Sequence, residues 1–340
     1  MPRECIAPAA HQVAFREYSD VPLRAGQVRV KSEFGAAKHG TEMALYKGYA
    51  NPRGAFDGEY KVFRAEKPLF SYPVGLGNMS VGTVIEVGPE VTQLKVGDRV
   101  FAHGGFREKH VWPETVRRLP EGVSWKAAVC LDPADFAMAA VRDGQVRIGD
   151  AVTVFGLGAI GLIVLQLAKL SGAYPLIGVD PIALRREVAT AYGADLVLDP
   201  TACNAGLEIK KATDRRGADV CIEYSGSHAA LQAALRGVAF GGTVVFGAWP
   251  GAYPAGLDLG AEAHFNRPNV IFSRACSEPN RDHPRWSEGR LFEVAWRLLR
   301  EGQIHCERIV QPVVAFDDLP AEYPKIETDP EQNIKLGVRF

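Results

Sequence analysis

The sequence lacks the features that mark exported, membrane-bound or nucleic-acid-binding proteins. Its six cysteines are scattered through 340 residues and form no Cys-x-x-Cys pair. No apolar run reaches the length of a membrane span, and the N-terminal segment has no apolar core of a signal peptide. The formal net charge of -1 offers no broad basic surface for nucleic acid or anionic lipid. We therefore expect reduced thiols and a cytoplasmic protein that binds neither nucleic acid nor membrane.

The chain also has no internal repeat and no low-complexity segment. Its composition, with 47% hydrophobic and 23% charged residues, is that of an ordinary globular protein. A length of 340 residues favours two domains, each able to bury a core.

The stretch from residue 151 to residue 180 predicts a dinucleotide site. A short apolar run is followed by a turn with the spacing G-x-G-x-x-G and then by an apolar helical segment. The first glycine, Gly156, allows a tight turn, and Gly158 lets a pyrophosphate approach the backbone. The third, Gly161, lets the helix pack close to the strand, and the helix N-terminus favours phosphate. A purely structural glycine turn is the alternative interpretation.

A second buried strand ends in Asp180, where a carboxylate can accept hydrogen bonds from an adenosine ribose. Its negative charge would repel a 2′-phosphate, so we expect NAD rather than NADP. Arg185 lies on the next predicted helix and could soften this preference.

The order of the remaining patterns predicts two kinds of domain. Short polar–apolar alternation and frequent Gly and Pro up to about residue 125 are typical of antiparallel strands. A helical pattern covers residues 125–142, and strands then alternate with helices as far as residue 273. A further amphipathic helix covers residues 291–299, and a strand at 334–340 could return to the first domain.

Several motifs occur in an order that resembles the medium-chain dehydrogenase/reductase superfamily. They are Val96-Gly97-Asp98-Arg99-Val100, Gly104-Gly105-Phe106, the glycine-rich turn, Gly193-Ala194-Asp195 and Gly241-Gly242-Thr243-Val244. The resemblance covers nearly the whole chain and is strongest to the sugar and polyol branch. It implies an α/β fold class: a Rossmann doubly wound parallel sheet at 134–276, and a β-rich GroES-like catalytic domain at 1–133 and 277–340 split around it.

The zinc ligands of the family are replaced in this chain. His39 stands where relatives have the ligand cysteine, and Asn78 where they have the ligand histidine. The third ligand position matches Asp132, and the lobe with four closely spaced cysteines is missing. Zinc prefers thiolate, imidazole and carboxylate ligands, so we expect no catalytic metal. The alternative is that His39 and Asp132 still recruit a metal with waters.

Without zinc, side chains must handle the proton that leaves the substrate hydroxyl. The candidates are Lys38, His39, Thr41, Glu42, Asn78 and Asp132. His39 has an ordinary pKa near working pH, Lys38 could serve if burial depresses its pKa, and Thr41 matches the family's proton-relaying hydroxyl. Lys38 as a solvated charge and His39 as a satisfied buried imidazole are the alternatives.

The resemblance also implies contacts to the cofactor. The expected cofactor-binding residues are Gly156, Gly158, Ala159, Ile160, Gly161, Asp180, Arg185, Ser225, Gly247 and Arg274. Arg274 could instead form a salt bridge in a dimer interface. The aromatic-rich connection from 51 to 73 borders the substrate cleft in relatives, or is a surface insertion here.

These features together predict an NAD-dependent oxidoreductase acting on a secondary hydroxyl or ketone of a small sugar, cyclitol or polyol, without zinc. A zinc-free enone or quinone reductase and a non-catalytic NAD(H)-binding sensor are the alternatives. The segment 266–276 forms a sheet-edge strand in the family, where two such edges pair, so we expect a homo-oligomer, a dimer or a tetramer.

Overall fold

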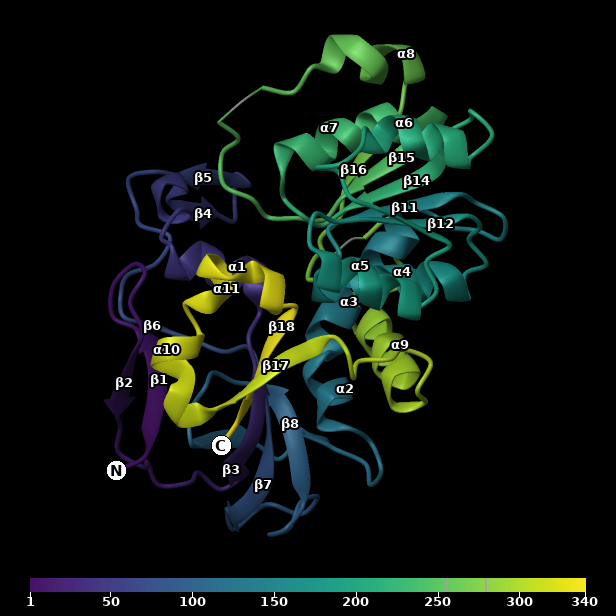
Figure 1. The fold of residues 1–340 in the computed structure, drawn as a ribbon. Helices are drawn as coiled ribbons and strands as arrows, with labels where there is room; N and C mark the ends of the chain where they lie inside the picture. Colours follow the sequence, from purple (N-terminus) through teal and green to yellow (C-terminus); the bar gives the residue numbers. More distant parts are fainter. Residues whose placement is uncertain (255, 279) are drawn as a thin grey trace. The chain divides into compact units, whose positions relative to one another are not determined.

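The computed structural model describes residues 1–254, 256–278 and 280–340. The chain forms two compact units (Figure 1). The first comprises Met1–Val129 and Val310–Phe340, and the second comprises Cys130–Ile309.

The second unit is built on a parallel sheet of six strands in the order β13-β12-β11-β14-β15-β16. The strands are β11 (Val152–Phe155), β12 (Leu176–Val179), β13 (Leu196–Leu198), β14 (Ala218–Glu223), β15 (Val238–Phe246) and β16 (Asn269–Phe272). Every residue of β11 and β12 is buried, which explains why both strands are apolar apart from Thr153. The order reverses between β11 and β14, so the carboxyl ends of these strands flank the crevice where such folds bind ligands.

Helices cover both faces of this sheet, with α6 and α7 on one face and α3, α4 and α5 on the other (Figure 1). The helices of the unit are α3 (Leu131–Asp143), α4 (Ala159–Leu170), α5 (Ala183–Ala191), α6 (Ala205–Ala212), α7 (His228–Gly237), α8 (His264–Asn266) and α9 (Glu288–Arg300). The predicted doubly wound α/β sheet is confirmed.

The first unit is β-rich. Its seven-stranded sheet follows the order β10-β8-β7-β3-β18-β17, and β9 also pairs with β3. The strands are β3 (Gln27–Ala36), β7 (Met79–Val87), β8 (Arg99–His103), β9 (Lys109–Pro113), β10 (Arg117–Arg118), β17 (Val310–Ala315) and β18 (Lys335–Arg339). β18 pairs antiparallel with β3, joining Gly337 to Ala36, so the C-terminal strand returns to the first domain as expected.

Two smaller sheets, four α-helices and three short 3-10 helices complete the described part of the first unit. The sheets contain β1 (Arg3–Ala7), β2 (Ala14–Glu17) and β6 (Val74–Gly75), and β4 (Ala55–Asp57) with β5 (Val62–Arg64). The helices are α1 (His39–Tyr46), α2 (Trp125–Val129), α10 (Leu319–Glu322) and α11 (Lys325–Thr328). A core of buried side chains, including Tyr46, Phe106 and Tyr323, joins α1 to α10 and α11.

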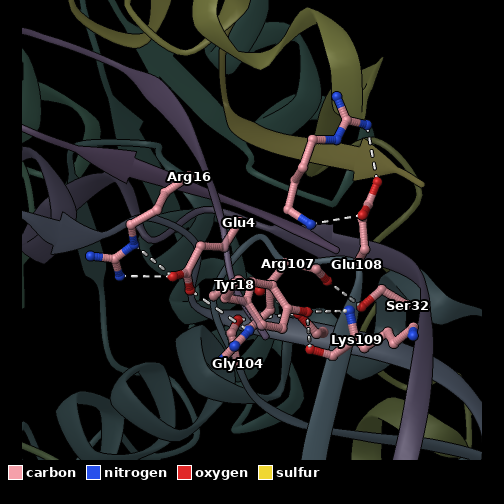
Figure 2. Close-up of polar contacts among 11 residues, drawn as sticks. Glu4, Arg16, Tyr18, Ser32, Gly104, Arg107, Glu108 and Lys109 are labelled. Atoms are coloured by element: carbon pink, nitrogen blue, oxygen red, sulfur yellow. Dashed lines mark hydrogen bonds and ion pairs between the residues drawn. The ribbon is translucent and has the colours of Figure 1, made fainter. Parts of the chain in front are cut away.

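Polar contacts fasten the N-terminal strands to the segment between β8 and β9 (Figure 2). Glu4 accepts a hydrogen bond from Arg16 at 2.7 Å and also faces Arg107, whose guanidinium lies 4.2 Å from the ring centre of Tyr18. The Tyr18 hydroxyl donates to the backbone oxygen of Lys109 at 2.9 Å. Each surface ion pair contributes only about 0–1 kcal/mol to the free energy of folding. The main effect of these contacts is therefore to hold the segment that follows Gly104–Phe106 in one position.

Two boundaries differ from the expectation. The helix expected at 125–142 is interrupted at Cys130 and forms α2 and α3. Pro133 lacks an N–H and is tolerated in the first turn of a new helix but not inside a continuous one. The first unit resumes at Val310 rather than at 277, because α9 packs against α3 in the second unit through a buried stripe that includes Leu291, Trp296 and Leu299.

Within the described residues, no helix is long and apolar enough to cross a membrane. The six cysteines form no disulfide in this structure.

Candidate active site

The glycine-rich turn has the backbone geometry that a dinucleotide site needs. Gly156 has a φ of 83°, and a Cβ there would lie 2.5 Å from the backbone nitrogen of Ser225. A Cβ on Gly161 would lie 1.9 Å from the Gly156 carbonyl oxygen, so these two glycines are required by packing. A Cβ on Gly158 would meet nothing within 4 Å, which leaves open space at the N-terminus of α4. The turn therefore forms an open cradle beside Ala159 and Ile160, the first residues of α4, and a helix N-terminus of this kind favours phosphate groups.

Asp180 is held by this turn. Its side chain follows β12 and is 2% exposed, with Oδ2 accepting from the backbone N–H of Leu157 and Oδ1 from that of Ile182, both at 2.8 Å. Arg185 approaches Oδ2 at 3.7 Å, while Arg186 donates to the Asp180 carbonyl oxygen. Both oxygens of Asp180 thus already accept a backbone hydrogen bond, which fixes the carboxylate beside the glycine-rich turn.

Glu223 is a buried carboxyl that the sequence interpretation missed. It ends β14, and it accepts hydrogen bonds from the backbone N–H of Ser225 at 2.6 Å and of Gly226 at 3.0 Å, as well as from the Ser225 hydroxyl. Burial raises the pKa of Glu223 to about 7, and these hydrogen bonds act in the opposite direction. The available signal was an acidic residue closing an otherwise apolar strand beside the glycine-rich turn.

Other expected cofactor residues lie at the same edge of the sheet. Ser225 follows β14 and packs against Gly156, and Gly247 follows β15, where a Cβ would lie 2.3 Å from the Tyr224 ring. Arg274 follows β16, is exposed, and donates to the Ser277 hydroxyl at 2.9 Å. Because parallel strands end at one edge, the sheet brings these positions to the same side as the glycine-rich turn.

In the first unit, Glu42 organises the start of α1. It is 6% exposed and accepts hydrogen bonds from the Gly77 backbone N–H at 2.6 Å, the Tyr323 hydroxyl at 3.1 Å and the Lys38 backbone N–H. Burial raises the pKa of Glu42, while these donors and the charge of Lys335 oppose that rise. Lys335 is itself 2% exposed and donates to the Ala37 carbonyl oxygen at 2.6 Å. All these neighbours are donors or a cation and favour the charged form, but burial is the larger effect and leaves the pKa of Glu42 raised.

The imidazole of His39 has a defined tautomer. The backbone N–H of Leu336 donates to His39 Nε2 at 2.9 Å. An N–H can only donate, so Nε2 carries no proton and the neutral ring carries its proton on Nδ1. In this arrangement His39 can donate a hydrogen bond through Nδ1, and protonation of Nε2 would break the bond to Leu336.

Asn78 lies next to this helix start because Glu42 binds its neighbour Gly77. The backbone N–H of Asn78 donates to the Ala36 carbonyl oxygen at 3.0 Å. Its side-chain Oδ1 is buried and has no hydrogen-bond partner among the described residues. Gly77 has a φ of 95°, and a Cβ there would lie 2.5 Å from the Phe106 nitrogen, so the backbone at this point is tightly constrained. The structure thus brings Lys38, His39, Thr41, Glu42 and Asn78 together.

The residues in this region do not form the donor set that zinc prefers. Asp132 belongs to the second unit, where it is buried in the first turn of α3. Near α1, His39 Nε2 is engaged by the backbone, and the nearby Asn78 offers only a neutral amide oxygen. In the part of the chain that the structure describes, no group of three or more His, Cys, Asp or Glu side chains is arranged to hold a metal ion.

Comparison with known proteins gives the class to which this fold and site belong. Residues 24–117 match the alcohol dehydrogenase GroES-like domain, and residues 159–286 match the zinc-binding dehydrogenase family. The chain belongs to the medium-chain dehydrogenase/reductase superfamily, whose members are NAD(P)-dependent dehydrogenases. It is an alcohol or polyol dehydrogenase of the medium-chain type and acts on a small molecule.

Among individual proteins, the chain is 46% identical to D-guloside 3-dehydrogenase of Escherichia coli (strain K12), over 99% of this chain and 100% of the relative. The crystal structure of 2R,3R-butanediol dehydrogenase from Bacillus subtilis superposes with a TM-score of 0.77 at 21% identity and covers 100% of both chains. Galactitol-1-phosphate dehydrogenase from Escherichia coli gives a TM-score of 0.77 at 18% identity, covering 99% of this chain and 100% of that one. The chain is thus similar over its full length to a dehydrogenase named for a sugar derivative, and the two solved structures share its fold.

Proposed function

We propose that this dehydrogenase uses NAD to oxidise a secondary hydroxyl of a sugar ring, at carbon 3 of a glycoside, without catalytic zinc. One observation supports the zinc-free part: His39 and Asn78 occupy the positions that, by the family resemblance, match the ligand cysteine and ligand histidine of zinc-containing relatives. The substrate class is supported by the similarity to D-guloside 3-dehydrogenase, which extends over the full length of both chains.

The choice of NAD over NADP is supported by the carboxylate at the end of β12, whereas the open cradle at Gly158 suits the pyrophosphate of either cofactor. The 2′-phosphate of NADP would bring up to two negative charges toward the carboxylate of Asp180 and would be repelled by it. Asp180 is only 2% exposed and is bonded to the glycine-rich turn, so it cannot easily move away. NAD, when bound, supplies the acceptor for the hydride that leaves the sugar carbon.

The first unit supplies candidates for proton handling. We propose that His39 positions the substrate oxygen and does not remove its proton, because its Nε2 is already bonded to Leu336. Lys38 then becomes the leading general base, with Thr41 relaying the proton. Asn78 would donate its amide N–H to a sugar hydroxyl, while its buried Oδ1 would accept from one.

Glu42 has a positioning role in this proposal. Both of its oxygens accept hydrogen bonds within the first unit, so it orients Lys38 and Gly77 rather than taking the substrate proton. Asp132, from the second unit, stays a candidate for a further contact to the substrate. We retain the expectation of a cytoplasmic homo-oligomer.

The test is a substrate panel with both cofactors. Purified enzyme is mixed with NAD or NADP and methyl glycosides of several hexoses, free sugars, polyols and 2,3-butanediol, and reduced cofactor is followed by absorbance. Borodeuteride reduction of the product then locates the new carbonyl by mass spectrometry. We expect turnover of glycosides with NAD and a keto group at carbon 3, and at least tenfold weaker binding of NADP.

Other outcomes would favour the alternatives. Reduction of enones or quinones by NAD(P)H without sugar turnover would make the chain a double-bond reductase. Tight NAD(H) binding without turnover of any hydroxyl, ketone or enone would support a non-catalytic sensor.

A further inference from the structure

A cavity of about 530 Å³ lies in the second unit, away from the glycine-rich turn. It is lined by the C-terminal ends of α3 and α4, the loop after α3, part of α9 and the segment at 282–285. Leu167, its nearest lining residue on α4, lies eight residues from Ala159 at the dinucleotide cradle, or about 12 Å at 1.5 Å per helical residue. Its volume falls within the range of small-molecule sites. The cavity is therefore distinct from the cofactor crevice.

Basic side chains dominate the polar part of its lining. Arg142, Arg147 and Arg285 face it, against a single carboxylate, Asp282. The C-terminal ends of two helices add a partial negative charge of about one half each. Subtracting these from the three guanidinium charges and the one carboxylate leaves about one net positive charge. The cavity therefore favours an anion.

Arg142 is fixed in place on the cavity lining. Its guanidinium lies 3.6 Å from the ring centre of Trp286, and its Nη2 pairs with Asp282 at 2.6 Å. Its Nε is buried and has no hydrogen-bond acceptor among the described residues. Because this N–H has almost no accessible surface, it is no contact for a ligand in the cavity, and Arg142 contributes to the lining through its charge.

Arg147 provides an accessible donor. It is exposed, and its guanidinium has no carboxylate partner in the described part of the chain and only a 3.4 Å contact to Gln145. An arginine guanidinium presents paired N–H groups that match the oxygens of a carboxylate or phosphate. The charge of Arg142 and the donors of Arg147 can together hold one anionic group.

Apart from Gln145 and Ser171, the rest of the lining is apolar. Its members are Met138, Val141, Val146, Leu167, Leu170 and Leu298. Such a surface would bind the apolar part of a ligand by removing it from water. A free inorganic anion would make no contact with this apolar surface. A neutral apolar molecule would form no charged hydrogen bond with the arginines.

We propose that this cavity binds an organic anion in which a carboxylate or phosphate is attached to an apolar skeleton. The anionic group lies against Arg142 and Arg147, and the skeleton lies along the apolar lining. This site is additional to the dinucleotide and sugar sites, and its existence does not depend on which sugar the enzyme oxidises.

The test is calorimetric titration of the protein saturated with NAD, so that the cofactor site is occupied. The probes are octanoate, octyl phosphate, 1-octanol and inorganic phosphate. We expect at least one of the two octyl anions to bind once per chain, and 1-octanol and inorganic phosphate to bind at least tenfold more weakly. The two octyl anions distinguish a carboxylate from a phosphate ligand.

Three variants locate the binding. Arg147→Gln should weaken the octyl anion about tenfold because it removes a charged donor, and Val146→Trp should weaken it further by filling the cavity. Arg216→Gln, the same change at an exposed arginine elsewhere in the unit, should have no effect. NAD affinity should stay unchanged in all three, which shows that they are folded. The proposal is overturned if neither octyl anion binds at millimolar concentration, if 1-octanol binds as tightly, or if Arg147→Gln and Val146→Trp both bind like the wild type.

Discussion

Replacing Glu223 with Gln should change how the stability of the protein depends on pH. The Gln carbonyl oxygen can accept the three hydrogen bonds that Glu223 Oε1 accepts from Ser225 and Gly226. The substitution therefore removes the charge and keeps most of the geometry. Any difference between the two proteins that varies with pH then reports the ionisation of Glu223.

The size of the effect follows from the raised pKa. Burial moves the pKa of Glu223 from 4.5 to about 7, so the folded state binds its proton more tightly than the unfolded state. The stability that this proton supplies is present at low pH and is lost as pH rises from about 4.5 to about 7. One pKa unit corresponds to about 1.4 kcal/mol, so the wild type should lose roughly 2.5 kcal/mol relative to Glu223→Gln between pH 5 and pH 8.

Urea unfolding at half-unit steps from pH 5 to pH 8 measures this difference, because other groups that titrate in the window cancel between the two proteins. Glu208→Gln, which removes a partly exposed carboxylate paired with Lys211 in the same unit, is the matched control and should give parallel curves. If Glu223→Gln also runs parallel to the wild type, Glu223 is ionised throughout and its buried environment does not raise its pKa.

Three further substitutions test the cofactor site, the sheet edge and proton handling. Gly156→Ala should destabilise the fold, because Gly156 has a positive φ and the new Cβ would lie 2.5 Å from a backbone nitrogen. Gly158→Ala should fold normally but bind NAD at least tenfold more weakly in a calorimetric titration. Normal NAD binding by both variants would refute the cradle. Phe272→Asp, at a side chain 78% exposed on edge strand β16, should convert a dimer to monomers in sedimentation, and a monomeric wild type would contradict this. Lys38→Met should lower kcat by roughly 10²–10⁴-fold with NAD affinity unchanged, because it removes the proposed base. His39→Gln should mainly raise KM. If His39→Gln lowers kcat and Lys38→Met only raises KM, His39 is the base.

The sequence carried enough information to predict most of the second unit. The strand, glycine turn, helix and terminal acid around Gly156 follow local rules of packing and chain geometry, so they are readable without the fold. The extent of the unit was less predictable. The apolar stripe of α9 identifies a buried face, yet nothing in its spacing identifies α3 as its partner, so the domain boundary was placed too early.

The chemistry near α1 depended on contacts between distant residues. The replacements at His39 and Asn78 were visible from motif positions alone. The tautomer of His39 is set by the Leu336 N–H, and the environment of Glu42 by Tyr323 and Lys335, all from the far end of the chain. Such contacts arise only when β18 pairs with β3, which is why the sequence could not separate a general base from a hydrogen-bond donor.

The central claim, oxidation of a sugar hydroxyl without zinc, is tested most directly by measuring metal content and turnover on the same preparation. Zinc per chain is determined by mass spectrometry before and after chelation, and kcat on the glycoside substrate is measured on each sample. The account predicts far less than one zinc per chain and an unchanged kcat. Stoichiometric zinc whose removal abolishes turnover and whose return restores it would contradict the account, and would make His39 and Asp132 metal ligands.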